Sequence, residues 1–228
     1  NRDLIIGIKV RLGRNASGEA GVVPLDVAEQ VADETGLPLM VHIDEPPPSY
    51  EAVLDRLRPG DVLTHAFRPF PNAPIDGRGR IKPAVLAARQ RGVVFDIGHG
   101  MGSFSWKTAR AMMAEGFAPD TISSDVHSLC INGPAYDQVT TLSKFLALDM
   151  RLSDVIAAST VNAAASRRRP RRWRSTIASP SRRCAAHANG VSPAATARCG
   201  GLACARATPS IRRRRSSRRR SPGSASRG

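Results

Sequence analysis

Short apolar runs alternate with longer, helix-like stretches over the first 165 residues. Runs of four to eight apolar and β-branched residues, bounded by Gly, Pro or polar residues, are typical of buried strands. They predict five strands, at residues 4–10, within the PLMVHI run with the strand end taken at His42, and at 61–66, 92–97 and 120–125. Between and after them, the apolar spacing predicts helical segments at 25–34, 50–58, 81–90, 105–115, 138–148 and 153–158.

This alternation predicts the fold class. Strands that alternate with helical stretches of about ten residues form successive βαβ units, which build a parallel sheet. The chain is therefore predicted to be α/β. An open doubly wound sheet and a closed eight-stranded barrel both fit the alternation.

Charge divides the chain into two parts. Residues 1–165 carry 16 Lys and Arg against 19 Asp and Glu, whereas 166–228 carry 18 Arg and no Lys, Asp or Glu, so the formal charge of +15 belongs to the second part. Its Arg, Ser, Ala, Pro and Gly cannot bury enough apolar surface to offset the entropy of ordering. We predict a folded part at 1–165 and a low-complexity, disordered tail at 166–228.

The basic tail admits two interpretations. Runs such as 168–174 and 212–220 would contact phosphates with a steep salt dependence, as in a nucleic-acid-binding arm. The loss of every acidic residue and nearly every aromatic favours an accidental composition, such as a shifted reading frame in a GC-rich gene. Non-specific RNA binding is expected either way. The spacing of Cys184, His187, Cys199 and Cys204 matches no common zinc finger.

Cysteine use and hydropathy bear on the compartment. Cys130 is the only cysteine in the first 165 residues, which favours a reducing compartment, and we expect a cytoplasmic protein. No stretch approaches the ~20 apolar residues that a membrane helix needs, so no membrane partner is expected.

Reactive side chains gather where the predicted strands end. Lys9, His42 and His65 close strands, and Asp125 closes the last. Because the carboxyl ends of parallel strands share one face, these four side chains are expected to converge. Two imidazoles and a carboxylate suit zinc and similar divalent ions. Lys9 does not fit that set, since an ammonium group repels a metal.

The motifs around these residues resemble the amidohydrolase superfamily, most closely its dihydroorotase-like, deacetylase-type branch. They are GIKVR, MVHIDEPP, LTHAFRP, FDIGHGMGSFSW and TISSDVHS. The resemblance implies a (β/α)8 TIM barrel, of which residues 1–165 would supply about strands four to eight. It also implies that CO2 carboxylates Lys9, so that this lysine becomes an anionic ligand bridging two divalent ions, with zinc the first choice.

The same resemblance implies roles for the other ligands. His42 and His65 would bind the second metal, and Asp125 would bind the first and act as general base. The expected reaction is hydrolysis of an amide or ester acyl group of a small molecule by a metal-activated hydroxide. Asp125 would pass the proton to the leaving group.

Three further residues are candidates for substrate binding. The glycines around His99 let the backbone approach a small ligand, so His99 and Gly100 are expected to contact the substrate, although Gly100 fits a structural turn equally well. Arg68, beside the His65 loop, is a weaker candidate for pairing with an anionic group.

The sequence departs from the family pattern in one important respect. It supplies five predicted strands, and no His-x-His pair, which the family carries on strand one, occurs in the 228 residues. The first metal would then lack ligands, so the isolated chain is expected to be inactive. Cyclic-amide hydrolysis and an inert scaffold remain alternatives, and the parent enzyme is expected to act on a small acylated substrate, with a homo-oligomer a further possibility.

Overall fold

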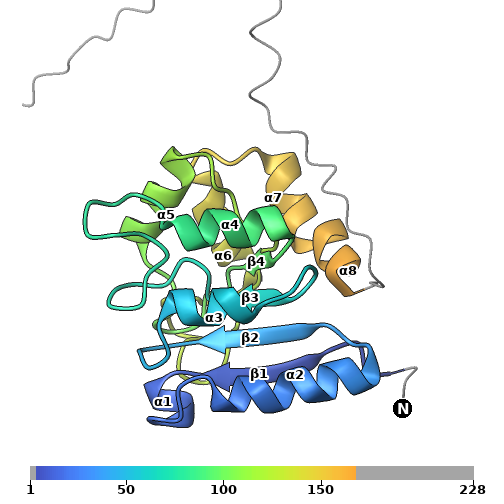
Figure 1. Cartoon of the computed structure of the whole chain (residues 1–228). Helices are drawn as coiled ribbons and strands as arrows, with labels where there is room; N and C mark the ends of the chain where they lie inside the picture. Colours follow the sequence, from blue (N-terminus) through green and yellow to red (C-terminus); the bar gives the residue numbers. More distant parts are fainter. Residues whose placement is uncertain (1–3, 168–228) are drawn as a thin grey trace, which may run out of the picture. The chain divides into compact units, whose positions relative to one another are not determined.

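The computed structural model describes residues 4–167, and the predicted tail, apart from residues 166 and 167, lies outside them. Four strands form one parallel sheet in chain order (Figure 1). They are β1 (Ile8–Leu12), β2 (Leu39–Ile43), β3 (Val62–Thr64) and β4 (Val94–Asp96). The α/β class and the parallel sheet predicted from the alternation are confirmed.

The helices of the described part include six that the apolar spacing predicts and two, at 14–17 and 161–167, that it does not. Their bounds are α1 (Arg14–Ser17), α2 (Val23–Thr35), α3 (Tyr50–Arg56), α4 (Pro83–Arg91), α5 (Trp106–Ala114), α6 (Gln138–Leu146), α7 (Leu152–Ser159) and α8 (Val161–Arg167). Their ends obey local rules. Gly36 and Gly92 end α2 and α4 in the left-handed conformation, while the side chains of Ser49 and Ser105 cap the first turns of α3 and α5. None of the helices in the described part is long and apolar enough to span a membrane.

The fifth predicted strand is only partly formed. In place of a strand over 120–125, a single parallel bridge joins Asp96 to Thr121. Beyond it the chain still runs beside the continuation of β4, because the His99 amide donates to the Ser123 carbonyl at 3.0 Å. Asp125 then adopts a positive φ of 45°, which ends the extended segment.

The first strand is displaced from its predicted position at 4–10. β1 begins at Ile8, whose register partner Leu39 is the first residue of β2, so residues 4–7 have no strand to pair with. Leu4 is accordingly 74 % exposed. Lys9 is therefore the second residue of β1, which corrects its expected place at the strand end.

The two faces of the sheet differ in burial. Ile8, Val10 and Leu12 of β1 turn towards the hydrophobic core with α2, whereas Lys9 and Arg11 are exposed on the other face. In β3 and β4 every residue is buried. We call the face that carries Lys9 and Arg11 the inner face; it is covered at β3 and β4 and open at β1.

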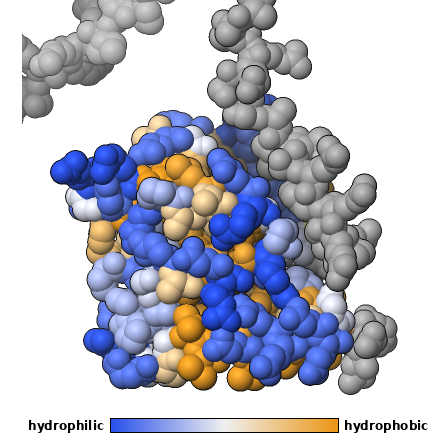
Figure 2. Space-filling model, viewed as in Figure 1, coloured by the Kyte–Doolittle hydropathy of each residue, from blue (hydrophilic) through white to orange (hydrophobic). Residues whose placement is uncertain are grey.

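Apolar surface is not confined to the core. Val23, Val27 and Val31 follow one another at four-residue spacing along α2 and remain exposed. Figure 2 shows apolar residues scattered among hydrophilic ones on one face of the molecule. The apolar pattern therefore predicts where α2 forms, but it does not separate its buried stripe from its exposed one.

Candidate metal centre

A row of polar side chains crosses the inner face near the carboxyl ends of the strands. The register pairs Arg11 with His42, His42 with Thr64 and Thr64 with Asp96. Register partners in a parallel sheet project to the same side, with strands about 4.8 Å apart. Lys9 pairs with Met40 and lies in the neighbouring row, two residues nearer the amino ends. We call the first set the polar row.

Asp96 anchors one end of the polar row. Its carboxylate is buried and accepts hydrogen bonds from the hydroxyls of Thr64 at 2.7 Å, Thr121 at 2.7 Å and Ser123 at 2.8 Å. Buried carboxylates are tolerated only when their oxygens are satisfied in this way. Asp96 thus holds β3, β4 and the segment before Asp125 in fixed relation.

A tight turn after β3 directs His65 back to the polar row. His65 has a φ of 69°, and its Nδ1 lies 2.6 Å from the carbonyl oxygen of Gly98. Gly98 itself has a φ of 46°, and a Cβ there would lie 2.2 Å from Thr64 Oγ1 and 2.9 Å from His65 Nδ1. Glycine is required at 98 because any side chain would displace His65.

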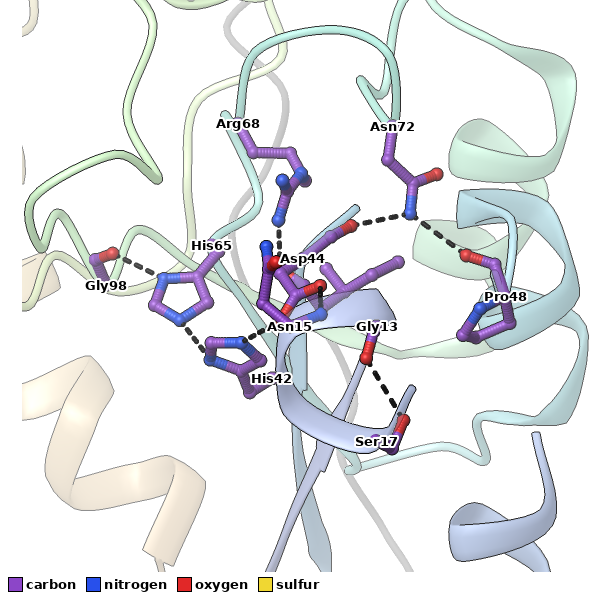
Figure 3. A network of polar contacts seen from close by, with 11 residues as sticks. Gly13, Asn15, Ser17, His42, Asp44, Pro48, His65, Arg68, Asn72 and Gly98 are labelled. Carbon is purple, nitrogen blue, oxygen red and sulfur yellow. Dashed lines mark hydrogen bonds and ion pairs between the residues drawn. The ribbon is translucent and has the colours of Figure 1, made fainter. Parts of the chain in front are cut away.

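The two predicted histidine ligands meet directly (Figure 3). His65 Nε2 lies 2.7 Å from His42 Nδ1, with the rings perpendicular, and His42 Nε2 lies 3.4 Å from Asp44 Oδ2. A carbonyl and a carboxylate can only accept, so His65 Nδ1 and His42 Nε2 carry the hydrogens. The facing nitrogens of the neutral rings then both present lone pairs. With these tautomers the 2.7 Å contact has no hydrogen of its own, so it favours a proton or another cation between the two nitrogens.

Burial disfavours a proton as that cation. Burial lowers the pKa of His42 to about 4, with further lowering by the neighbouring His65 and Arg11. Burial is also the main cause that lowers the pKa of His65. A histidine that donates its second nitrogen to a carbonyl or carboxylate is typical of metal ligands, since that bond fixes the tautomer. Two tetrahedral zinc–imidazole bonds of ~2.0–2.1 Å would place the two nitrogens about 3.3–3.4 Å apart, so the 2.7 Å contact would have to open slightly to admit such an ion.

Lys9 and Asp125 complete the predicted set less tightly. Lys9 is exposed on the open inner face, yet loss of hydration against the sheet lowers its pKa, while the charges of Asp125 and Asp96 oppose that shift. Asp125 is exposed, and a Cβ on Gly100 would lie 2.8 Å from its Oδ2. Within residues 4–167 no three His, Cys, Asp or Glu side chains are arranged to hold a metal. The ligands for a closed first site are not assembled here.

His99 lies beside this centre with both ring nitrogens already engaged. Its Nδ1 is 2.9 Å from the Gly100 carbonyl, and its Nε2 is 2.7 Å from Lys144 Nζ. The buried ring also stacks on Phe104, and burial lowers its pKa. In this structure His99 therefore joins the Gly100 loop to α6. No local pattern indicates this role for Lys144, which lies 45 residues away from His99 in the sequence.

Arg68 is enclosed rather than presented to a ligand. It is buried, and its guanidinium donates to the Ile43 carbonyl, while its own carbonyl accepts from Thr108. Burial lowers the pKa of Arg68. Its Nε has no partner among the described residues, but it is closed to solvent. Arg68 joins β2, the loop after β3 and α5.

Sequence reasoning missed two carboxylates of the centre. Asp96 is the last residue of β4. This strand-end position is like the one predicted for Asp125, so the rule that selected Asp125 also selects Asp96. Asp44 lies two residues beyond His42, inside the MVHIDEPP motif, and contacts its ring. Both carboxylates position the groups around the histidines, a role that a ligand pattern in the sequence does not reveal.

The curated proteins that this chain resembles are named deacetylases. The chain is 39% identical over 164 residues to "Deacetylase Atu3266" of Agrobacterium fabrum and 39% identical over 164 residues to a deacetylase of Brucella anthropi. These alignments cover 72% of this chain but only 40% and 41% of the relatives. The chain thus spans about two fifths of the length of the curated relatives it matches. No family model matches the sequence.

Solved structures give the fold family. An adenine deaminase superposes with a TM-score of 0.70 at 37% identity, over 72% of this chain and 46% of that one. A dihydroorotase superposes with a TM-score of 0.66 at 38% identity, over 73% and 43%. Both neighbours are TIM-barrel members of the amidohydrolase superfamily. The region that these alignments share is therefore a partial amidohydrolase-type fragment with an α/β fold.

Proposed function

We propose that this chain forms the part of a metal-dependent, deacetylase-type hydrolase that carries the histidine pair. The observation that supports this most strongly is the pair of imidazole nitrogens of His42 and His65, 2.7 Å apart, with their outer nitrogens bonded to Gly98 and Asp44. The deacetylase names of the relatives support the reaction class. A cytoplasmic location remains part of the proposal.

The residues divide the chemistry as follows. His42 and His65 would hold the second divalent ion. Lys9, carboxylated by CO2, would bridge it to the first ion, which Asp125 would hold in part. When bound, such ions lower the pKa of a water molecule and polarise an acyl oxygen. Asp125 is exposed to solvent and would accept and return the proton. Asp96 and Gly98 keep the polar row and His65 in place.

The donor count limits what the chain does by itself. The first ion, the one at Asp125, would have only Lys9 and Asp125 as ligands, fewer than the three or four protein ligands of stable zinc sites. We therefore expect the isolated chain to bind about one zinc ion and to hydrolyse acylated substrates very slowly.

The direct test is the metal content of the purified full chain. After zinc loading and dialysis, elemental analysis should find about one zinc per chain, and His42→Ala or His65→Ala should lose it. His127→Ala is the matched control, because His127 is exposed and its ring contacts only a backbone amide within residues 4–167. Zinc absent from the unaltered chain, or retained in both site variants, would refute the proposal.

Cyclic-amide hydrolysis is the second candidate, because one structural neighbour is a dihydroorotase. Turnover of dihydroorotate, compared with that of N-acetylated amino acids and O-acetylated hydroxy acids, separates the two reactions. We expect the acetylated compounds to be preferred, as the relatives' names indicate.

Nucleic-acid binding by the basic tail is a separate possibility that concerns residues outside the described part. It would appear as salt-sensitive RNA affinity that disappears when 166–228 are removed. Zinc content should not depend on that deletion.

A further inference from the structure

Arg11 is the one member of the polar row whose side chain has no polar partner among residues 4–167. His42 contacts His65 and Asp44, and Thr64 and Asp96 bond to each other. Arg11, next to His42 in register, is exposed on the inner face and enters no ion pair or side-chain hydrogen bond in the described part.

Most other arginines of the described part have an acidic partner. The ion pairs are Arg14–Glu19, Arg56–Asp26, Arg58–Asp61, Arg80–Asp76, Arg89–Asp120 and Arg151–Asp154. Arg78 and Arg110 likewise enter no ion pair in the described part, so what distinguishes Arg11 is its place in the polar row, next to His42. The planar set of donors of a guanidinium matches a carboxylate with two parallel hydrogen bonds.

Arg11 lies on the open part of the inner face, close to two of the predicted ligands. Strand alternation places it on the same face as Lys9, about 7 Å along β1 at the ~3.3 Å rise per residue of a parallel strand. It is also the register partner of His42. Lys9 lies two residues nearer the amino end of β1, so Arg11 is the nearer of the two to the carboxyl ends of the strands.

We propose that Arg11 is the specificity-determining residue that binds the anionic group of the substrate, a role that Arg68 cannot fill because it is enclosed. The inference rests on the proposed function. It names the substrate class as a small acylated acid, whose carboxylate lies a few bonds from the acyl group. The carboxylate would contact the Arg11 guanidinium while the acyl group faces His42 and His65.

Methionine methyl groups offer a readout of this site that does not require activity. All five methionines lie at or before residue 150, so the basic tail contributes no signal. Met40 is the register partner of Lys9 and lies on the inner face. The full chain, labelled with ¹³C at the methionine methyls, is titrated with N-acetylglycine and with its neutral analogue N-acetylglycinamide, with and without zinc.

We expect N-acetylglycine to shift the Met40 methyl signal in a saturable way, and the amide to bind about tenfold more weakly or not at all. Arg11→Gln should weaken N-acetylglycine by about tenfold or more. Arg110→Gln is the matched control, since Arg110 is exposed on α5 and faces the Trp106 ring; it should leave the titration unchanged.

Three results would overturn the inference: no Met40 shift with either probe, equal shifts with both, or an unaltered titration in Arg11→Gln. If Arg11→Gln lost zinc but kept N-acetylglycine binding, Arg11 would serve Lys9 rather than the substrate. Metal content measured on the same samples separates the two proposals. If the chain binds zinc but the Met40 shift does not depend on Arg11, only this inference is refuted. If the Met40 shift depends on Arg11 but the zinc-loaded chain retains no zinc, only the metal centre is refuted.

Discussion

The strands β3 and β4 are buried on every residue, whereas β1 exposes Lys9 and Arg11 on its inner face. In the buried region, polar groups are fixed by mutual hydrogen bonds, as Asp96 is by three hydroxyls. In the open region, Lys9 and Arg11 are exposed, and neither is held by an ion pair among residues 4–167. One sheet therefore supplies both rigid support, through Asp96, and accessible charged side chains, on β1.

Removing the buried anchor should have the largest effect. Asp96→Ala leaves the hydroxyls of Thr64, Thr121 and Ser123 without their acceptor, at about 1–3 kcal/mol for each unsatisfied buried group. We expect the free energy of unfolding to fall by about 3–5 kcal/mol, measured by urea denaturation. Asp55→Ala, at an exposed carboxylate on α3, should change it by less than about 0.5 kcal/mol. Equal losses in the two variants would contradict the comparison.

A glycine substitution tests whether close packing or backbone conformation matters more. Gly98→Ala would force a Cβ to within 2.2 Å of Thr64 Oγ1, so we expect about 2–4 kcal/mol of destabilisation and weaker zinc binding. Gly79→Ala is matched, with a φ of 81° and no atom within 4 Å of the added Cβ. It should lose only the ~1–2 kcal/mol of a left-handed residue and keep its zinc. Thermal unfolding and metal analysis of both variants decide the point.

Zinc should stabilise the chain through the histidine pair that links the open and buried regions. At a free concentration 100 times the dissociation constant, binding to the folded state alone adds about 2.7 kcal/mol to the free energy of unfolding. The increase should disappear with a chelator and in His65→Ala. An equal increase in His65→Ala would place the metal elsewhere.

The smallest effect expected is a dependence on pH from His99. Burial lowers its pKa in the folded chain, so below the unfolded value of about 6.5 the unfolded state binds the extra proton. The stability due to neutral His99 is therefore present above pH 6.5 and is lost as the pH falls below it, by no more than about 1.4 kcal/mol per pH unit. His99→Gln should flatten the curve of unfolding free energy between pH 7 and 5, while His127→Gln should leave it unchanged. A curve equally steep in His99→Gln would show that other groups dominate.

The sequence predicted the framework of the fold because its signals are local. Apolar runs and the glycines that end helices placed β2 and α2 within one or two residues of their observed bounds. The segment before Asp125 was less predictable, because whether TISSD forms a strand depends on the partners that its backbone finds. Residues 4–7 continue the apolar run of β1 but lie beyond the start of β2, so they remain unpaired.

For the site, the sequence by itself indicated that His42 and His65 lie near the carboxyl ends of neighbouring strands, although it misplaced Lys9, which is the second residue of β1. Only the tertiary structure decided the rest: the lone pairs that face each other, the enclosure of Arg68, the engagement of His99 by Lys144 and the exposure of Arg11. The physical reason is that strand-end position follows from local alternation of apolar and polar residues. Burial and hydrogen-bond partners, in contrast, depend on contacts between residues 20 to 45 positions apart, such as the His42–His65 and His99–Lys144 pairs.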